Sequence, residues 1–151
     1  MIKIICVGKL KEKGLKEIET EYIKRLNKYI KLEIVEIADE NDRDKNNALL
    51  LEKEKILSKI KEKDNIVILD IKGKEYDSIS FSNFIQSELT HNSNITFIIG
   101  ASNGLSEEIK NLTNKKISFS KFTFPHQLFR ILLLEQVYRS FKILNNETYH
   151  K

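Results

Sequence analysis

The last third of the chain carries the stretch that decides the fold, FSKFTFPHQLFR at residues 119–130, which runs on into the helical segment 128–144. Apolar residues surround this helix instead of forming one stripe, so we expect it to be buried on nearly all sides. It also carries polar side chains, which are costly to bury without partners: His126, Gln127, Arg130, Glu135, Gln136 and Arg139. These residues indicate a site, although a simple i,i+4 pair of Glu135 with Arg139 and solvated neighbours stays open as an alternative.

Upstream of this stretch, short apolar strands alternate with helices. Strands are predicted at residues 2–7, 32–38, 65–71, 95–99 and 116–120, and helices at 15–29, 48–63, 80–90 and after Ser106. Ser78 or Ser80 is expected to cap the third helix and Ser106 the fourth, while Pro125 suits the first turn of the last. Residues 39–47 are expected to form the most mobile loop. This alternation predicts a single α/β domain, residues 1–151, with a parallel sheet covered on both faces.

Composition restricts the class of protein. The chain has 151 residues, of which 40% are hydrophobic and 32% charged, as in globular proteins. No apolar run reaches the roughly 20 residues of a membrane span, and no export signal is seen. The single cysteine, Cys6, excludes a disulfide framework and is expected in the core, so a cytoplasmic protein is predicted. The net charge of +4 is compatible with a polyanionic partner, but a lysine-rich proteome would give the same bias.

Three loops are expected to leave the carboxyl ends of the strands, where ligands bind in open parallel sheets. They cover residues 69–74, 100–105 and 119–125. Gly73, Gly100 and Gly104 in these loops would allow close approach of the backbone to a bound molecule. The alternative is that the glycines only make tight turns, but three such loops together favour a ligand site.

Several familiar sites are missing from the sequence. Neither the dinucleotide fingerprint nor the phosphate loop occurs, so a Rossmann site is weakly supported and a P-loop is excluded. The three histidines, His91, His126 and His150, are far apart along the chain, and one cysteine cannot build a zinc cluster. No metal site is therefore predicted. A Ser-His-Asp triad stays open, without a nucleophile elbow to support it.

The ordered set of motifs resembles a known family. The set comprises VGKLK at 7–11, DIKGK at 70–74, IGASNGL at 99–105, SFSKFTFPHQL at 118–128, EQVYR at 135–139 and YHK at 149–151. It is similar to the bacterial ribosomal large-subunit pseudouridine methyltransferases of the SPOUT superfamily, over the whole chain. The resemblance implies a trefoil-knotted α/β fold, a homodimer and S-adenosylmethionine as methyl donor. It also implies methylation of N3 of a pseudouridine in helix 69 of 23S rRNA, on the assembled ribosome and without membrane or metal.

The resemblance also implies which residues do the work. The cofactor site would use Leu69, Gly100, Phe119, Ser120, Lys121, Phe122, Thr123 and Phe124. The catalytic and RNA-facing residues would be His126, Arg130, Arg139, Tyr149 and His150. Two positions depart from the family pattern: Ala101 stands where a second glycine is usual, and Thr148 where proline is common. Ala101 would weaken donor binding if its backbone needed a positive φ.

Methyl transfer to the imide N3 needs the methyl group to be aligned with the nitrogen. It also needs a base that removes the N3 proton, or a group that stabilises the resulting negative charge. We expect His150 or Tyr149, on a chain end that could order over the substrate, to lie near the target base. Arg130 and Arg139 would hold phosphate or developing negative charge. Two other classes of protein remain as alternatives: a non-catalytic ribosome- or RNA-binding factor of the same fold, and a flavodoxin-like nucleotide-binding enzyme. The second is disfavoured because residues 8–11 make a poor phosphate loop.

Overall fold

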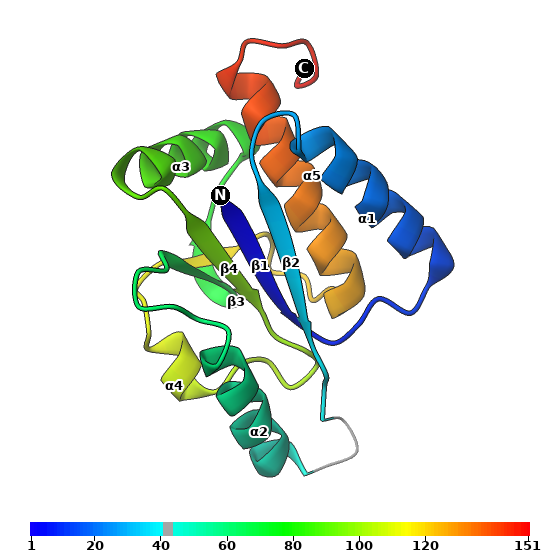
Figure 1. Ribbon diagram of the computed structural model, residues 1–151, viewed down its shortest axis with the longest axis vertical. Coiled ribbons are helices and arrows are strands. Elements are labelled where there is room, and N and C mark those ends of the chain that lie inside the picture. The colour runs from blue at the N-terminus through cyan, green and yellow to red at the C-terminus, as the bar shows by residue number, and fades with distance from the viewer. Residues whose placement is uncertain (41–43) are drawn as a thin grey trace.

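A computed structural model describes residues 1–40 and 44–151 as five strands that alternate with five helices (Figure 1). In chain order these are β1 (Ile2–Val7), α1 (Lys13–Leu26), β2 (Leu32–Ile37), α2 (Lys45–Leu57), β3 (Ile66–Glu75), α3 (Ser78–His91), β4 (Ile95–Ile99), α4 (Glu107–Lys110), β5 (Lys116–Ser118) and α5 (His126–Leu144). The predicted alternation is confirmed. The loop expected at 39–47 is shorter, because α2 begins at Lys45, and its residues 41–43 lie outside the described residues.

The strands form one parallel sheet in the order β2-β1-β4-β3-β5. β1 and β4 lie in the middle and are buried along their whole length, which explains their nearly unbroken apolar sequences. Parallel strands place all their carboxyl ends at the same edge of the sheet. The loops that follow β3, β4 and β5 therefore meet at one edge.

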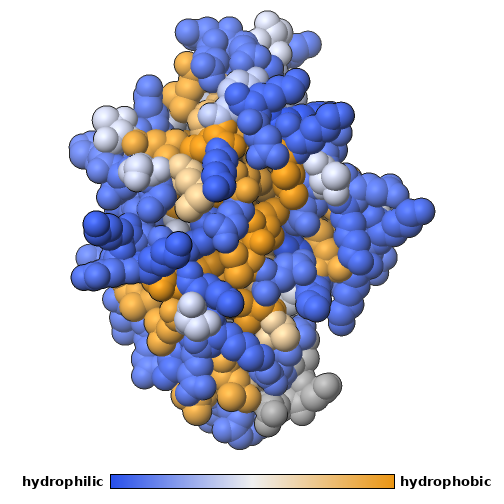
Figure 2. All heavy atoms as spheres, in the orientation of Figure 1, coloured by the Kyte–Doolittle hydropathy of each residue, from blue (hydrophilic) through white to orange (hydrophobic). Residues whose placement is uncertain are grey.

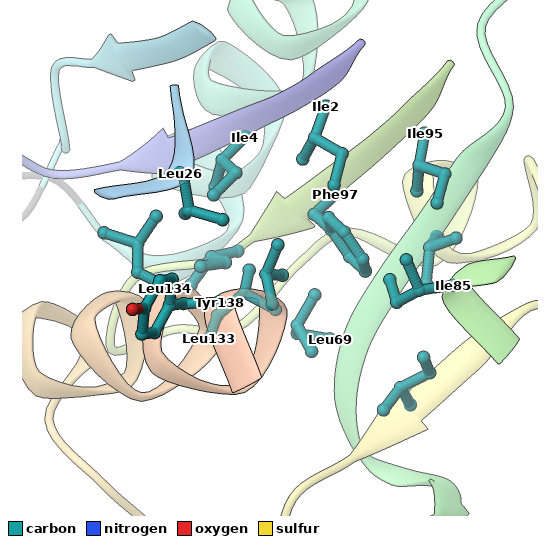
Figure 3. Close-up of a cluster of buried hydrophobic side chains, with 14 of the residues drawn as sticks. Ile2, Ile4, Leu26, Leu69, Ile85, Ile95, Phe97, Leu133, Leu134 and Tyr138 are labelled. Carbon is teal, nitrogen blue, oxygen red and sulfur yellow. The ribbon is translucent and has the colours of Figure 1, made fainter. Parts of the chain in front are cut away.

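Helices cover both faces of the sheet, as predicted. On one face, α1, α3 and α5 pack over alternate residues of the central strands. Figure 3 shows Ile2 of β1 and Phe97 of β4 facing Leu133 and Leu134 of α5, all of them fully buried. On the other face, α2 and α4 cover a second cluster of buried residues that includes Ile5. The two clusters follow from the period of two along each strand.

The prediction that α5 is buried on nearly all sides is confirmed for most of its length. Among its residues, only Leu128 has a clearly exposed side chain, at 38%. The edge strand β2 is covered less completely, since Leu32, Ile34 and Val35 are partly exposed. On the face seen in Figure 2, apolar side chains form a band through the middle of the molecule, with hydrophilic side chains around it. No helix in the described part of the chain is both long and apolar enough to cross a membrane.

β3 is longer than predicted, because residues 72–75 stay in the sheet. After a register shift between Leu69 and Lys74, the strand continues along β5, and Lys74 lies opposite Ile117. Gly73 sits at the shift, where a Cβ atom would lie 2.6 Å from backbone atoms of Ile117. Only glycine allows this approach, so Gly73 serves the sheet and not the end of the strand. β5 is shorter than predicted and ends at Ser118.

The predicted start of α3 was wrong in detail. The cap of α3 is Asp77, whose carboxylate accepts the amide of Ser80 at 2.7 Å, while the Ser80 hydroxyl accepts the amide of Asp77. This reciprocal capping box uses Ser80 at the third helical position and leaves Ser78 without the capping role. The last helix follows Pro125 as predicted, with Pro125 at the N-cap position. The predicted cap of α4 by Ser106 is confirmed. α2 ends at Leu57, six residues before the predicted end.

Candidate functional site

The loops after β3, β4 and β5 and the start of α5 enclose a cavity of about 640 Å³. Its size lies in the usual range for small-molecule sites, about 300–1,000 Å³. The lining includes seven of the eight predicted cofactor residues: Leu69, Gly100, Phe119, Ser120, Phe122, Thr123 and Phe124. Lys121 does not line the cavity and is exposed. The structure thus brings together residues that are up to 55 positions apart, as Leu69 and Phe124 are.

The cavity has an apolar wall and a charged edge. The wall includes Ile99 and Leu105, and the rings of Phe119 and Phe129, which are tilted against each other with their centres 4.9 Å apart. At the edge, Asp70 Oδ2 lies 3.4 Å from Lys110 Nζ. Burial opposes ionisation of Asp70, but the amide of Lys72 and the Lys110 ammonium outweigh it and lower the pKa of the carboxyl. Sequence reasoning missed Lys110, for which no sequence signal was available, and Phe129.

The loop after β4 is closely packed at Gly100. A Cβ atom there would lie 2.6 Å from the carbonyl oxygen of Gly104, so a larger residue would push the loop apart. Gly104 itself has a φ of +74°, which favours glycine. Ala101 needs no such freedom, because Asn146 is the only non-glycine residue with a positive φ in the described part of the chain. The methyl group of Ala101 is buried in the second apolar cluster, so this departure from the family pattern does not strain the loop.

His126 stands at the start of α5 and lines the cavity. Its ring packs against Gly8, where a Cβ atom would come within 2.7 Å of Nε2. Gly8 also has a φ of +97°, so both its backbone and its neighbour require glycine. Burial lowers the pKa of His126, with the nearby Asp39 acting against the shift and the charges of Arg130 and Lys11 adding to it. The ring is therefore neutral at pH 7.

Arg130 lies one turn further along α5, and only 2% of the residue is exposed. Its guanidinium binds two carboxylates, Glu19 Oε2 of α1 at 3.1 Å and Glu36 Oε1 of β2 at 2.6 Å. Burial raises the pKa of Glu19, and the charge of Arg130 opposes that shift. Because the guanidinium is buried and already bound by two carboxylates of the same chain, the geometry favours a structural role for Arg130 over contact with RNA.

Arg139, Tyr149 and His150 gather at the opposite end of α5. Arg139 donates to Glu135 Oε1 through Nε at 3.0 Å and Nη2 at 2.6 Å, so the ion pair left open by the sequence is present. The Tyr149 hydroxyl donates to the same oxygen at 3.2 Å, and its ring lies under the guanidinium at 4.6 Å. His150 Nδ1 is 3.3 Å from Arg139 Nη1. The chain end is thus held on the helix by three contacts with Glu135 and Arg139.

The predicted catalytic residues therefore form two groups. Arg139 follows His126 by 13 positions in α5. Because an α-helix rises about 1.5 Å per residue, the two residues are about 20 Å apart along the helix axis. A groove of about 530 Å³ lies between them. His150 and Gln136 line one part of it, and Phe119 and Phe124, which also line the cavity, line another. The groove and the cavity thus share a wall.

Other reactive side chains are shielded or dispersed. Burial raises the pKa of the Cys6 thiol to about 12, so the thiol stays protonated and packs in the core as predicted. Burial, together with the neighbouring Tyr149 hydroxyl, raises the pKa of Tyr22 to about 12. Within residues 1–40 and 44–151, no group of three or more His, Cys, Asp or Glu side chains is arranged to hold a metal ion.

The buried ring of His126 gives a pH prediction. Its pKa in the folded protein is below the ordinary 6.5, so the neutral ring stabilises the fold fully above pH 6.5, and this contribution is lost as the pH falls further. The C2 proton of His126 in NMR spectra is expected to titrate below pH 6.5. The His126→Gln variant should lose less unfolding free energy between pH 8 and pH 5 than the wild type, with His91→Gln on the exposed end of α3 as control. Titration of His126 at or above 6.5 would contradict this.

Comparison with known proteins places the chain in a family. A family model described as "Predicted SPOUT methyltransferase" matches residues 1–150. The chain is 52% identical to Ribosomal RNA large subunit methyltransferase H 1 of Clostridium perfringens and 54% identical to Ribosomal RNA large subunit methyltransferase H of Clostridium botulinum. Each alignment covers 99% of both chains. The resemblance inferred from the motifs is confirmed: the chain belongs to the SPOUT methyltransferase family.

Proposed function

We propose that this protein transfers the methyl group of S-adenosylmethionine to N3 of a pseudouridine in helix 69 of 23S rRNA, on the assembled ribosome. The observation that carries the proposal is the cavity closed by three loops at the carboxyl edge of the sheet, in a chain 52% identical to a ribosomal RNA large subunit methyltransferase. The donor and the rRNA substrate follow from the family and from the names of these relatives. The modified atom and the ribosomal context rest on the motif resemblance.

The cavity fits the donor in size and chemistry. Apolar side chains such as Leu69 and Phe119 would hold the adenosine and exclude water, and backbone groups near Gly100 could bind its polar edge. When bound, S-adenosylmethionine supplies an electrophilic methyl group on a positively charged sulfur. The Asp70 carboxylate, kept ionised by Lys110 and the Lys72 amide, offers a negative group at the rim for a cationic ligand. We assign the predicted cofactor residues to this role, with Lys121 outside the lining.

The transfer is an in-line displacement, so the protein mainly has to align the two reactants. N3 of pseudouridine is a weak nucleophile while it is protonated, and a base or a positive charge near it lowers the barrier. His126 is neutral and lies on the cavity wall, where it could accept a proton. Arg139 offers a fixed positive charge beside His150. Arg130, whose charge is already balanced by two carboxylates, is assigned to positioning the start of α5.

We propose that the groove next to the cavity is the binding site of the target nucleotide. Phe119 and Phe124 line both the cavity and the groove, so a base in the groove would lie beside a donor in the cavity. His150 lines the far part of the groove and would meet the target strand there, together with Tyr149. The contacts of Tyr149 with Glu135 and Arg139 show how the chain end is held before RNA binds.

A homodimer and a trefoil knot complete the proposal, within one domain that acts in the cytoplasm. Three apolar side chains that line the cavity or the groove are exposed: Ile71 at 54% and Phe122 at 79% in the cavity, and Ile79 at 53% in the groove. Exposed apolar side chains around two adjoining sites favour an interaction face, which a second copy of the chain would cover. The knot would involve the chain from the loop at 100–105 to α5. In its favour, α5 starts beside Gly8 of β1 although β5 lies at the far edge of the sheet.

The decisive experiment is transfer of labelled methyl groups from S-adenosylmethionine to ribosomes that lack the modification, with free 23S rRNA in parallel. Label on a helix 69 pseudouridine, and only with ribosomes, is the expected result. Donor binding with transfer to another RNA would change the substrate. If the protein neither binds the donor nor transfers methyl groups, the non-catalytic ribosome- or RNA-binding factor becomes the better-supported function.

A further inference from the structure

We propose that Lys9 and Lys11, held beside the cavity by the start of α5, bind backbone phosphates of the RNA strand that carries the target nucleotide. The inference rests on the proposed function, because it assumes that RNA approaches this cavity. The loop that carries the two lysines connects β1 to α1 and runs past the first turn of α5 (Figure 1).

The loop is fixed to α5 through its backbone. The Lys11 amide donates to Gln127 Oε1 at 2.8 Å, and the Leu10 amide donates to Glu36 Oε1 at 3.2 Å. That Glu36 oxygen is also the acceptor for Arg130, so the buried guanidinium holds both α5 and the loop. A loop anchored at two successive amides loses little further backbone entropy on binding, so the cost is confined to its side chains.

The two ammonium groups are available to a partner. Both side chains are exposed. Over residues 1–40 and 44–151, neither Lys9 nor Lys11 forms an ion pair, whereas Lys3 and Lys110 are paired with carboxylates. The loop thus presents two ammonium groups that form no ion pair within the described residues, although the Asp39 carboxylate lies near Gly8 of the same loop.

The position of this charge favours RNA as the partner. Gly8 packs on His126, which lines the cavity, and the charge of Lys11 is close enough to lower the pKa of His126. A polynucleotide with one base near the donor must pass its phosphates over the rim of the cavity. Lysines on the loop beside the cavity would attract those phosphates without reading sequence. The net charge of the whole protein is only +4, so charge placed at the rim matters more than total charge.

The test compares the Lys9→Gln/Lys11→Gln variant with the wild type at 50–200 mM salt. Each phosphate contact contributes a slope of about 0.7–0.9 to the dependence of log affinity on log salt. If two contacts are lost, the ratio of wild-type to variant kcat/KM should therefore fall by about 7- to 12-fold as the salt concentration rises from 50 to 200 mM. The change should appear in KM for ribosomes, with kcat and donor affinity unaltered. The matched control, Lys61→Gln/Lys63→Gln, removes two exposed lysines between α2 and β3.

Sedimentation of the same variants with ribosomes measures binding without relying on transfer. Weaker, less salt-dependent binding of the loop variant alone supports the proposal, even if transfer to helix 69 fails in the wild type. Equal slopes for the loop variant and the wild type would overturn it, even if transfer succeeds. If the loop variant binds ribosomes more weakly but binds free 23S rRNA as well as the wild type does, the loop contacts a ribosomal protein. That result would also overturn the proposed contact with RNA phosphates.

Discussion

Replacing Arg130 by methionine is expected to lower the free energy of unfolding by about 3–5 kcal/mol at pH 8. The substitution keeps most of the side-chain volume but removes the only charge that binds both Glu19 and Glu36 in the described contacts. Breaking a buried ion pair from one side leaves the remaining charge without compensation, which costs more than the pair contributed. Urea unfolding followed by circular dichroism measures the change.

The pH dependence of this variant identifies the cause. Burial already raises the pKa of Glu19, and without the opposing charge of Arg130 this pKa should rise further, so the variant loses stability relative to the wild type as the pH increases. Its deficit should therefore be smaller at pH 5 than at pH 8. Arg25→Met, which removes an exposed arginine paired with Glu21, is the control and should change little. An Arg130→Met protein as stable as the wild type at pH 8 would refute the structural role.

Replacing Arg139 by alanine is expected to lower kcat for methyl transfer about 100- to 1,000-fold, the range found when one charge-stabilising donor is lost from an active site. Donor affinity should be unchanged, because Arg139 does not line the donor cavity. The reason is the position of the guanidinium, bound to Glu135 and next to His150 at the chain end. Steady-state kinetics with ribosomes and calorimetry with S-adenosylmethionine separate the two quantities.

Two further variants show which property of this cluster matters. Arg139→Lys keeps the charge but loses the two-nitrogen contact with Glu135, so it should recover only part of kcat. Tyr149→Phe removes the hydroxyl that donates to Glu135 and keeps the ring under the guanidinium. Its effect should be smaller than that of Arg139→Ala. If kcat of Arg139→Ala stays within threefold of the wild type, the cluster is not catalytic.

Local patterns were sufficient for much of the fold. The apolar runs predicted the parallel sheet, and the unusual composition of residues 128–144 predicted a buried helix, because burial on all sides leaves no polar stripe. Because parallel strands end at one edge, the sequence also predicted that loops 69–74, 100–105 and 119–125 would share a site. The ordered motifs identified the family.

The partners of the polar side chains were beyond the sequence, since they depend on which elements become neighbours. Arg130 is 94 residues from Glu36, and nothing local distinguishes that carboxylate from Glu33, which is equally exposed on the same strand. The same holds for Gly73, whose role appears only once β3 continues along β5.

Chain order likewise hid the division of the catalytic candidates. The chain end folds back onto Arg139 and Glu135 and not onto His126, about 20 Å away along α5, and no local pattern predicts these contacts. The sequence alone therefore determined the architecture, the family and the loops that form the cavity, because these depend on local periodicity and motif order. The tertiary structure alone decided which charges are neutralised inside the protein and which face a substrate, because electrostatic partners are chosen by distance in space.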